Sequence, residues 1–368
     1  MNTTKYLHRV SGLALSVALM AVTMVGISSC SSDDDELVMN EKGEYRVQIS
    51  MGVQQSDVIT RAASYHDSSL DDFSEGATLV LKCRNLDPNK NEVLTKTSTF
   101  MWDAEKEQYV WSDIYLAAGK YDIFAVIPGD GSASFVDATE TWTISEVPVV
   151  SQKDVLAAKK VPSFEVKEVK TYGPNKLELY CDHLTSKITP NMKINNAYSL
   201  IRMVYVSKID VSSTTTNKYT ATVTYNTAGE PQFSWGISGS SDSKSNALVF
   251  SEQSFDSNKR GTIPAANERK GKQLTTSFQE FRNKGGYMLP VGDNDNVDMT
   301  IRYDVYSANG TLTRQNVYAT NTIKLKTWNS NKSAEAGKNY KLQIEVIPTY
   351  LYTLSDDDLV SQFLISDN

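Results

Sequence analysis

Apolar and polar residues alternate with a period of two in many short segments of this 368-residue chain. In the first such segment, Tyr45, Val47, Ile49 and Met51 are each separated by one polar residue. Successive side chains of a strand point to opposite faces, so this spacing predicts a strand with one buried and one solvated face. Further alternating or β-branched runs lie at 77–81, 121–127, 141–144, 177–180, 200–209, 219–225, 297–305 and 340–346.

Turn residues separate these runs, as in Asp87-Pro88-Asn89 and Gly173-Pro174-Asn175. Helical periodicity is scarce, and only residues 152–160 predict a short helix, because an apolar Leu-Ala-Ala stretch there ends in two lysines. Many short strands with frequent turns favour packed sheets over alternating strands and helices. The sequence therefore predicts an all-β chain built from β-sandwiches.

The first 29 residues have the pattern of a processing segment. Lys5 and Arg9 precede an uncharged apolar run from Leu13 to Ile27. This run has about 15 residues, fewer than the ~20 that a spanning helix needs. We therefore interpret residues 1–29 as a signal peptide, with a permanent membrane span as the alternative.

The end of this segment predicts attachment to lipid. Ile27-Ser28-Ser29-Cys30 resembles a bacterial lipobox, which implies cleavage before Cys30 and acylation of its thiol. Two or more acyl chains hold a protein stably on a bilayer. The acidic run at 31–36 cannot pack, so residues 30–43 are predicted to be an acidic tether. A plain secretory signal with an incidental cysteine is the alternative to the lipobox. The acidic run also resembles the export signal of surface lipoproteins in one group of Gram-negative anaerobes, with an ordinary charged spacer as the alternative.

The remainder of the chain is long enough for two domains with cores of their own. Ser, Asn, Gly and Lys dominate residues 226–283, which predicts long loops there. A Ser/Thr run directly after a strongly apolar stretch places the domain boundary near Ser212. The predicted parts are an N-terminal sandwich at 44–211, a C-terminal sandwich at 212–347 and a tail at 348–368.

Charge and cysteine content narrow the range of partners. Removal of Lys5 and Arg9 with the leader changes the formal net charge from −7 to −9, which opposes binding to nucleic acid. Only Cys83 and Cys181 remain after Cys30, and both lie in apolar or strand-like stretches. They predict two buried thiols rather than a disulfide scaffold, with a single bridge as the alternative.

Residues for catalysis or metal binding are few. The chain contains no HExxH, P-loop, GxSxG or CxxC motif, and only His66 and His183 follow the leader. A dyad of Cys181 and His183 is conceivable, but no third partner is indicated, which favours a structural histidine. The acidic run at 293–298 lacks the glycine and distal glutamate of an EF-hand loop. We expect no enzymatic activity, no metal and no cofactor.

Five tryptophans leave a different function open. Exposed tryptophans can form a platform for sugars, so a surface lipoprotein that binds glycan is the alternative function. Most of the tryptophans lie near alternating apolar neighbours, which favours packing instead. The five are Trp102, Trp111, Trp142, Trp235 and Trp328.

Several short motifs follow one another along the chain. They are Trp111 with Gly119-Lys120-Tyr121-Asp122-Ile123, Asp154-Val155-Leu156-Ala157-Ala158, the stretch 179–188, Tyr287-Met288-Leu289-Pro290, and Ala336-Gly337-Lys338-Asn339-Tyr340. Together they resemble the fimbrillin family, the Mfa-like pilin lipoproteins of anaerobe surface fimbriae. The stretch 179–188 is the most specific, being similar to the family's Phe-x-His-Leu-x-Ser-Lys. The resemblance implies two tandem transthyretin-like β-sandwich domains and a structural subunit for adhesion, located in fimbriae at the surface of the outer membrane.

The family resemblance also implies assembly by donor-strand exchange. An Arg-specific protease would remove an N-terminal strand, and a strand from another pilin subunit would fill the groove. Arg61, followed by Ala62, lies in a polar stretch after the first alternating strand and is the natural cleavage site. Cleavage would release the strand of Tyr45, Val47, Ile49 and Met51. The alternative is that Arg61 is one exposed arginine among several and stays uncut.

The C-terminal tail is the candidate donor strand. It has two alternating sets of apolar residues, interrupted by the acidic run 356–358. The alternative is a tail that packs on its own domain. The candidate donor residues are Tyr350, Tyr352, Leu354, Phe363 and Ile365.

Overall fold

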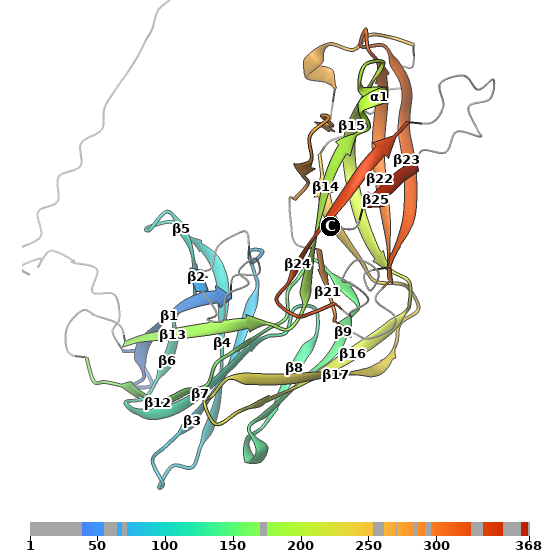
Figure 1. The fold of residues 1–368 in the computed structure, drawn as a ribbon. Helices are drawn as coiled ribbons and strands as arrows, with labels where there is room; N and C mark the ends of the chain where they lie inside the picture. Colours follow the sequence, from blue (N-terminus) through green and yellow to red (C-terminus); the bar gives the residue numbers. More distant parts are fainter. Residues whose placement is uncertain are drawn as a thin grey trace, which may run out of the picture. The chain divides into compact units, whose positions relative to one another are not determined.

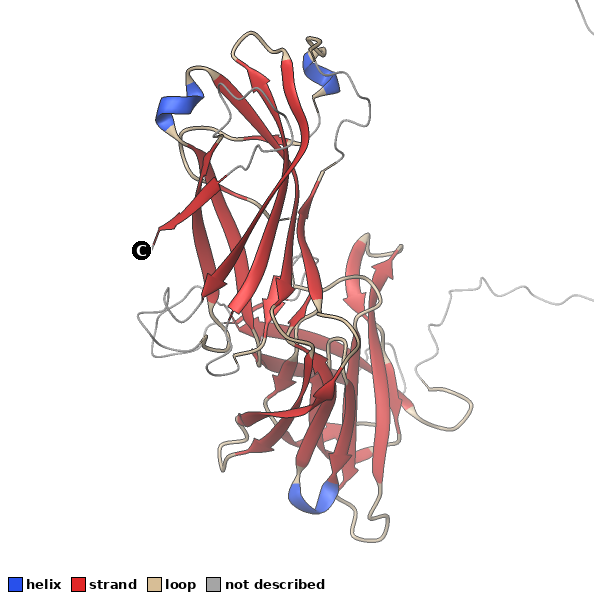
Figure 2. Ribbon diagram, turned by 90° about the vertical axis from the view of Figure 1, so that its right-hand side faces the viewer, coloured by secondary structure: helices blue, strands red, loops and turns tan. Residues whose placement is uncertain are grey.

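The computed structural model is built almost entirely of β-strands. It describes residues 39–54, 65–67, 72–169, 175–252, 261–269, 271–282, 286–290, 296–324, 334–348 and 362–366. Helical structure in these ranges is limited to α1 (Asn196–Ser199) and the 3₁₀ turns η1 (Asp137–Thr139) and η2 (Ala266–Glu268) (Figure 2). The predicted all-β class is confirmed.

The first sheet has ten of the described strands, in the order β2-β1-β13-β11-β7-β3-β4-β5, with β12 beside β7 and β6 beside β1 (Figure 1). Each predicted run that falls in this sheet is a strand. The bounds are β1 (Tyr45–Gln54), β2 (Tyr65–Asp67), β3 (Thr78–Asn85), β4 (Val93–Asp103), β5 (Gln108–Trp111), β6 (Ile114–Leu116), β7 (Gly119–Ile127), β11 (Leu156–Ala158), β12 (Val161–Val166) and β13 (Asn175–His183).

The second sheet has the order β17-β16-β9-β8. Its strands are β8 (Ser132–Val136), β9 (Thr141–Pro148), β16 (Asn217–Tyr225) and β17 (Pro231–Ser240). The hairpin of β16 and β17 follows the expected boundary at Ser212, yet it pairs with β9 from the first half of the chain. Strand β17 lies inside the stretch 226–283, where long loops were expected, and β16 ends directly before it.

The third sheet, β18-β15-β22-β23 with β19, and the fourth, β10-β21-β14-β24-β25 with β20, contain the other strands. Strand β15 runs through residues 211 and 212, so the predicted boundary lies inside a strand. The bounds are β10 (Val150–Ser151), β14 (Ser186–Ile194), β15 (Arg202–Ser213), β18 (Asn246–Ser251), β19 (Lys272–Gln273), β20 (Gln279–Glu280), β21 (Gly286–Met288), β22 (Asn296–Ser307), β23 (Leu312–Lys324), β24 (Asn339–Ile347) and β25 (Gln362–Ser366).

Strand β7 separates two hydrophobic cores. Tyr121 and Ile123 belong to a core that also contains the apolar residues of β1, whereas Phe124 and Val126 belong to a core shared with the second, third and fourth sheets. All five residues from Ile123 to Ile127 are buried. A strand covered on both faces has a continuous apolar run, and this is the pattern of β7.

The helix predicted at residues 152–160 is wrong. Leu156–Ala158 forms strand β11, which pairs antiparallel with β7 on one side and with β13 on the other. All three of its residues are buried. A short apolar run fits a buried strand as well as a helix, and the two neighbouring strands determine the outcome here.

Candidate functional site

Strand β1 carries the residues predicted to leave on activation, and it lies inside the first sheet. Its residues 47–53 pair in parallel with β13, from Val47 opposite Asn175 to Val53 opposite Cys181 (Figure 1). On its other side, β1 pairs with β6 at residues 45–47 and with β2 at residues 52–54. Its backbone therefore takes part in ladders on both sides.

One face of β1 is a row of apolar side chains in the core. Val47, Ile49 and Met51 are 0%, 5% and 2% exposed, and Tyr45 packs partly buried against the same core. Val53, with 0% exposure, extends the row by one residue that the sequence analysis left out. Each fully buried side chain of this size contributes about 1.5–3 kcal/mol.

Ion pairs hold the N-terminal end of β1. Arg46 Nε lies 2.5 Å from Asp113 Oδ2, with both side chains largely shielded from solvent. Lys96 Nζ lies 2.9 Å from Oε1 of Glu44, the residue that precedes β1. Burial raises the pKa of Glu44, but hydrogen bonds from Asn40 and Lys96 and nearby lysine charges lower it more, so the net pKa is lowered.

A histidine largely shielded from solvent holds the C-terminal end of β1. His183 Nε2 lies 2.9 Å from the main-chain oxygen of Gln54, the last residue of the strand. His183 Nδ1 contacts the Asp154 carboxylate, which also accepts a hydrogen bond from Thr185. Burial lowers the pKa of His183, but the Asp154 charge and the hydrogen bonds raise it more, leaving it above the ordinary value.

The third partner that the sequence did not indicate for His183 is thus Asp154, 29 residues earlier in the chain. The thiol in this region is unsuited to nucleophilic attack. Cys181 is buried and free, and burial raises the pKa of its thiol well above the usual range. Cys83 is also buried and free, and burial raises its pKa to about 12. Among the described residues, no group of three His, Cys, Asp or Glu could hold a metal ion.

The tail contains a strand that pairs within the chain. Strand β25 pairs antiparallel with β24, with Phe363 opposite Val346 and Ile365 opposite Ile344. Strand β24 pairs in parallel with β14 on its other side. The other candidate donor residues, Tyr350, Tyr352 and Leu354, lie outside the described residues. So do Cys30 and the predicted cleavage site at Arg61 and Ala62.

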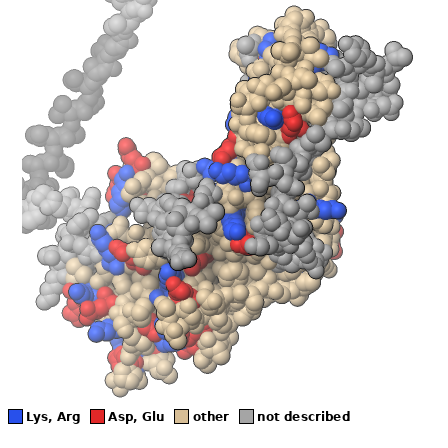
Figure 3. Space-filling model, viewed as in Figure 1, with Lys and Arg blue, Asp and Glu red and all other residues tan. Residues whose placement is uncertain are grey.

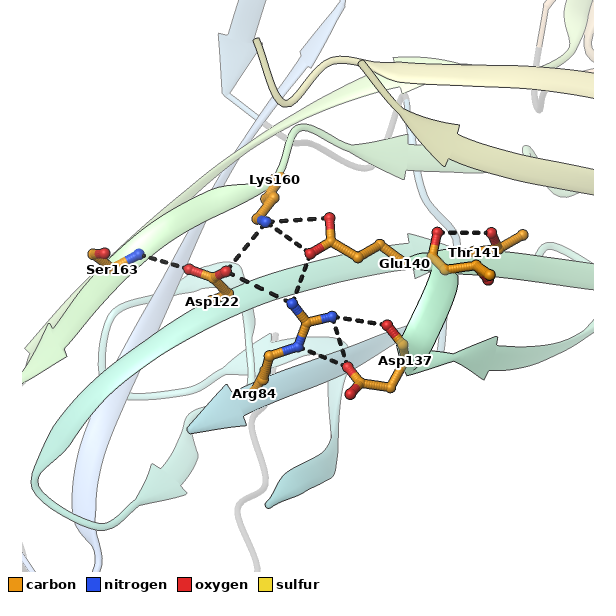
Figure 4. Close-up of polar contacts among 8 residues, drawn as sticks. Arg84, Asp122, Asp137, Glu140, Thr141, Lys160 and Ser163 are labelled. Atoms are coloured by element: carbon orange, nitrogen blue, oxygen red, sulfur yellow. Dashed lines mark hydrogen bonds and ion pairs between the residues drawn. The ribbon is translucent and has the colours of Figure 1, made fainter. Parts of the chain in front are cut away.

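A network of five charged side chains joins β3, β7 and Lys160, the residue before β12, to the turn before β9 (Figure 4). Arg84 contacts Asp137 at 2.7 Å and Glu140 at 2.6 Å, and Lys160 contacts Asp122 at 3.1 Å and Glu140 at 3.0 Å. Both cations also lie about 5 Å from the centre of the Phe124 ring. Burial raises the pKa of Glu140, but its two cationic partners lower it more, so the net pKa is lowered.

The exposed surface of the first sheet mixes both signs of charge. On the face in Figure 3, basic and acidic side chains are interspersed and no single-sign stripe is visible. Arg84 and Lys160 are two of the cations whose charges are balanced by acidic neighbours. This face lacks the concentration of positive charge that typically marks a nucleic-acid interface.

The tryptophans divide between core and surface. Trp111 and Trp142 are buried, at 3% and 0% exposure. Trp235 is partly buried, and its indole N–H donates a hydrogen bond to the main-chain oxygen of Leu184 at 3.2 Å. Trp102 is 46% exposed and lies 5.2 Å from the ring of Tyr109 on the hairpin of β4 and β5. Trp328 lies outside the described residues.

Comparison with known proteins gave matches among solved structures. No family model matches the chain, and no curated protein matches it. A candidate cell adhesion protein from Bacteroides uniformis is 14% identical, with TM-score 0.38, over 89% of this chain and 99% of its own. A candidate cell adhesion protein from Bacteroides fragilis is 10% identical, with TM-score 0.42, over 88% and 97%. The fimbrial anchor protein Mfa2 from Porphyromonas gingivalis is 10% identical, with TM-score 0.28, over 88% and 98%.

No helix in the described part of the chain is long and apolar enough to cross a membrane.

Proposed function

We propose that this chain is a structural subunit of surface fimbriae, without enzymatic activity, that functions in cell adhesion. In this proposal it is exported as a lipoprotein precursor, is anchored in the outer membrane through acylated Cys30, and assembles with other pilin subunits by strand exchange. An Arg-specific protease cuts after Arg61, and β1 leaves together with the lipid-bearing segment. The subunit then takes up a strand from another subunit.

The position of β1 in its sheet is the observation that carries this proposal. A strand with ladders on both sides and an apolar row from Val47 to Val53 leaves an open backbone edge and a hydrophobic groove when it is withdrawn. An unpaired edge recruits another strand through main-chain hydrogen bonds, and pockets for alternate side chains set the choice. The vacated site therefore favours an incoming strand with alternating apolar residues.

The tail is the proposed source of that strand. Phe363 and Ile365 alternate within β25, which forms one ladder, with β24, among the described residues. A terminal strand with a partner on one side has fewer main-chain bonds to break than one inside a sheet. In the proposal, β25 leaves β24 and enters the groove of the next subunit.

Limited proteolysis tests the assembly step. The precursor lacking residues 1–30 is incubated with a trace of Arg-specific protease and followed by gel electrophoresis and electron microscopy. We expect a stable fragment that begins at Ala62 and forms SDS-resistant ladders or filaments. Arg61→Lys is the matched control, because it keeps the charge but removes the cleavage site. A wild-type chain that resists cleavage at Arg61, or is cut and stays monomeric, contradicts the proposal.

Exposed Trp102 beside Tyr109 favours a second candidate function, the capture of glycan by a surface lipoprotein. Aromatic faces of this kind can stack on sugar rings. Binding to a glycan array, lost in Trp102→Ala and retained in Trp111→Phe, would support it. No binding to any glycan, with filaments formed after cleavage, would exclude it in favour of the fimbrial subunit.

A further inference from the structure

The end of β1 is held by an imidazole that lies between two hydrogen-bond acceptors. His183 Nδ1 faces the Asp154 carboxylate, and His183 Nε2 faces the Gln54 carbonyl at 2.9 Å. The side chains of His183 and Asp154 are 11% and 2% exposed. Water is therefore largely excluded from the pair. Each ring nitrogen depends on the acceptor that it faces for its hydrogen bond.

Only the protonated imidazole donates from both nitrogens. A neutral ring donates from one, so one of its two neighbours loses its hydrogen bond. The Asp154 carboxylate remains an acceptor in either case, and its other oxygen is already bonded to Thr185. The geometry therefore couples the proton on His183 to the hydrogen bond that holds Gln54.

The position of Gln54 in the chain gives this coupling a consequence. Gln54 is the last residue of β1, and the segment with Arg61 follows it directly. After cleavage there, the strand is free to separate from this end. The hydrogen bond from His183 is then the side-chain contact nearest to the new chain end among those described for β1.

We propose that His183 and Asp154 form a protonation-dependent lock on the C-terminal end of β1, which sets how readily the strand separates from the sheet. The lock deepens, and rests on, the proposed release of β1. His183 is a positioning residue that acts through the main chain of Gln54. Protonated His183 keeps the strand end in place, and loss of the proton loosens it.

The sign of the pH dependence follows from the raised pKa of His183. The contribution of the lock is fully present below the ordinary histidine pKa of about 6.5 and is lost as the pH rises through the folded value. Asp154 and Asp72 face the ring with negative charge, and Asp182 adjoins it on β13. In addition, β2 places His66 and Asp67 opposite Val53 and Gly52 of β1.

Two measurements on the uncut precursor lacking residues 1–30 test the lock without any polymerisation. Histidine-labelled NMR follows the titration of His183, assigned with the His66→Gln variant. Hydrogen exchange with mass spectrometry follows the amides of residues 45–54 from pH 6 to 9, corrected for intrinsic exchange. We expect protection of β1 to fall about tenfold over the pH range in which His183 loses its proton, which is the order of magnitude for the loss of one hydrogen bond.

Three variants separate the lock from other causes. His183→Asn keeps an amide near Asp154 but leaves Gln54 without its donor, so β1 protection should be low and independent of pH. Asp154→Asn removes the charge that holds the proton on His183, so the loss of β1 protection should shift to lower pH. This variant tests the lock independently of whether His183→Asn folds. His66→Gln should behave as the wild type. Protection that is flat with pH in the wild type, or a pH dependence that disappears in His66→Gln, overturns the lock.

Failure of the lock is distinguishable from failure of the proposed function. If β1 shows the expected exchange but cleaved protein never polymerises, the lock stands and strand exchange falls. If cleaved protein polymerises at the same rate from pH 6 to 9 and exchange is flat, strand exchange stands and the lock falls.

Discussion

Arg46 and Asp113 form an ion pair with an Nε–Oδ2 distance of 2.5 Å, and their side chains are 13% and 20% exposed. Hydrogen bonds to charged groups contribute more than neutral ones, about 1.5–3 kcal/mol each. We expect Arg46→Gln to lower the free energy of unfolding by about 1–2 kcal/mol in urea titrations, after allowance for partial exposure. Lys153→Gln, in the more exposed pair with Asp130, should leave it unchanged. An equal effect of both variants would contradict a special role for Arg46.

The apolar row of β1 should tolerate truncation poorly. Ile49→Ala removes buried methyl and methylene groups and leaves a cavity, for which we expect a loss of about 2–5 kcal/mol in the free energy of unfolding. Ser50→Ala is the matched control, because Ser50 lies on the exposed face of the same strand. Equilibrium denaturation of both variants makes the comparison. Similar losses would show that β1 is not packed as described.

The charge network around Arg84 gives stability a defined dependence on acid. The pKa of Glu140 is lowered, so its contribution is present above the unfolded value and lost as the pH falls through the folded value. We expect Arg84→Gln to cost about 1–3 kcal/mol at pH 7, and the cost should shrink towards pH 3. Denaturation curves from pH 3 to 7 measure the difference. A cost that stays constant with pH would exclude Glu140 as the partner that matters.

The two buried thiols should be unreactive in the folded chain. Burial raises the pKa of Cys83 to about 12 and that of Cys181 further, so little thiolate forms at pH 8. Iodoacetamide should modify neither residue in the native protein lacking residues 1–30, and both in urea. Intact mass spectrometry counts the adducts. Rapid modification of the native protein would mean that one of these strands opens readily.

Removal of the tail separates folding from assembly. A chain ending at Ile347 retains the described partners of β1 but lacks β25, so it should fold and be cut at Arg61 without forming ladders. A peptide with the wild-type tail sequence, when added, should bind to the cut subunit. Filaments formed by the truncated chain would show that another segment donates the strand.

Local alternation was sufficient to predict four of the ten strands described for the first sheet, namely β1, β3, β7 and β13. The run from Tyr45 to Met51 became β1, and the apolar stretches at 121–127 and 177–180 became β7 and β13. In these strands, burial alternates or is continuous as the position in the sheet requires. The helix expected at 152–160 failed because Leu156–Ala158 gains two strand partners, and a short apolar run contains no information about them.

Contacts between residues far apart in the sequence could not be predicted from local patterns. Asp154 and Thr185 surround His183 only because the strand order places β11 beside β13. The partners of Arg84 lie 53 and 56 residues away, with no spacing to indicate them. Strand β17 was concealed by its Ser- and Gly-rich composition, since most of its residues are exposed and need not be apolar.

The parallel pairing of β1 with β13 also sets an order in time. His183 and Gln54 are 129 residues apart, so β1 is synthesised long before the strand that it must join. Pairings across such separations form late, because chain closure precedes the gain from contact. Strand β13 has a second attachment through β11, so the sheet can be organised before β1 arrives. In the proposed activation, this late-joining strand is also the one that is withdrawn, without reversal of the folding steps that preceded it.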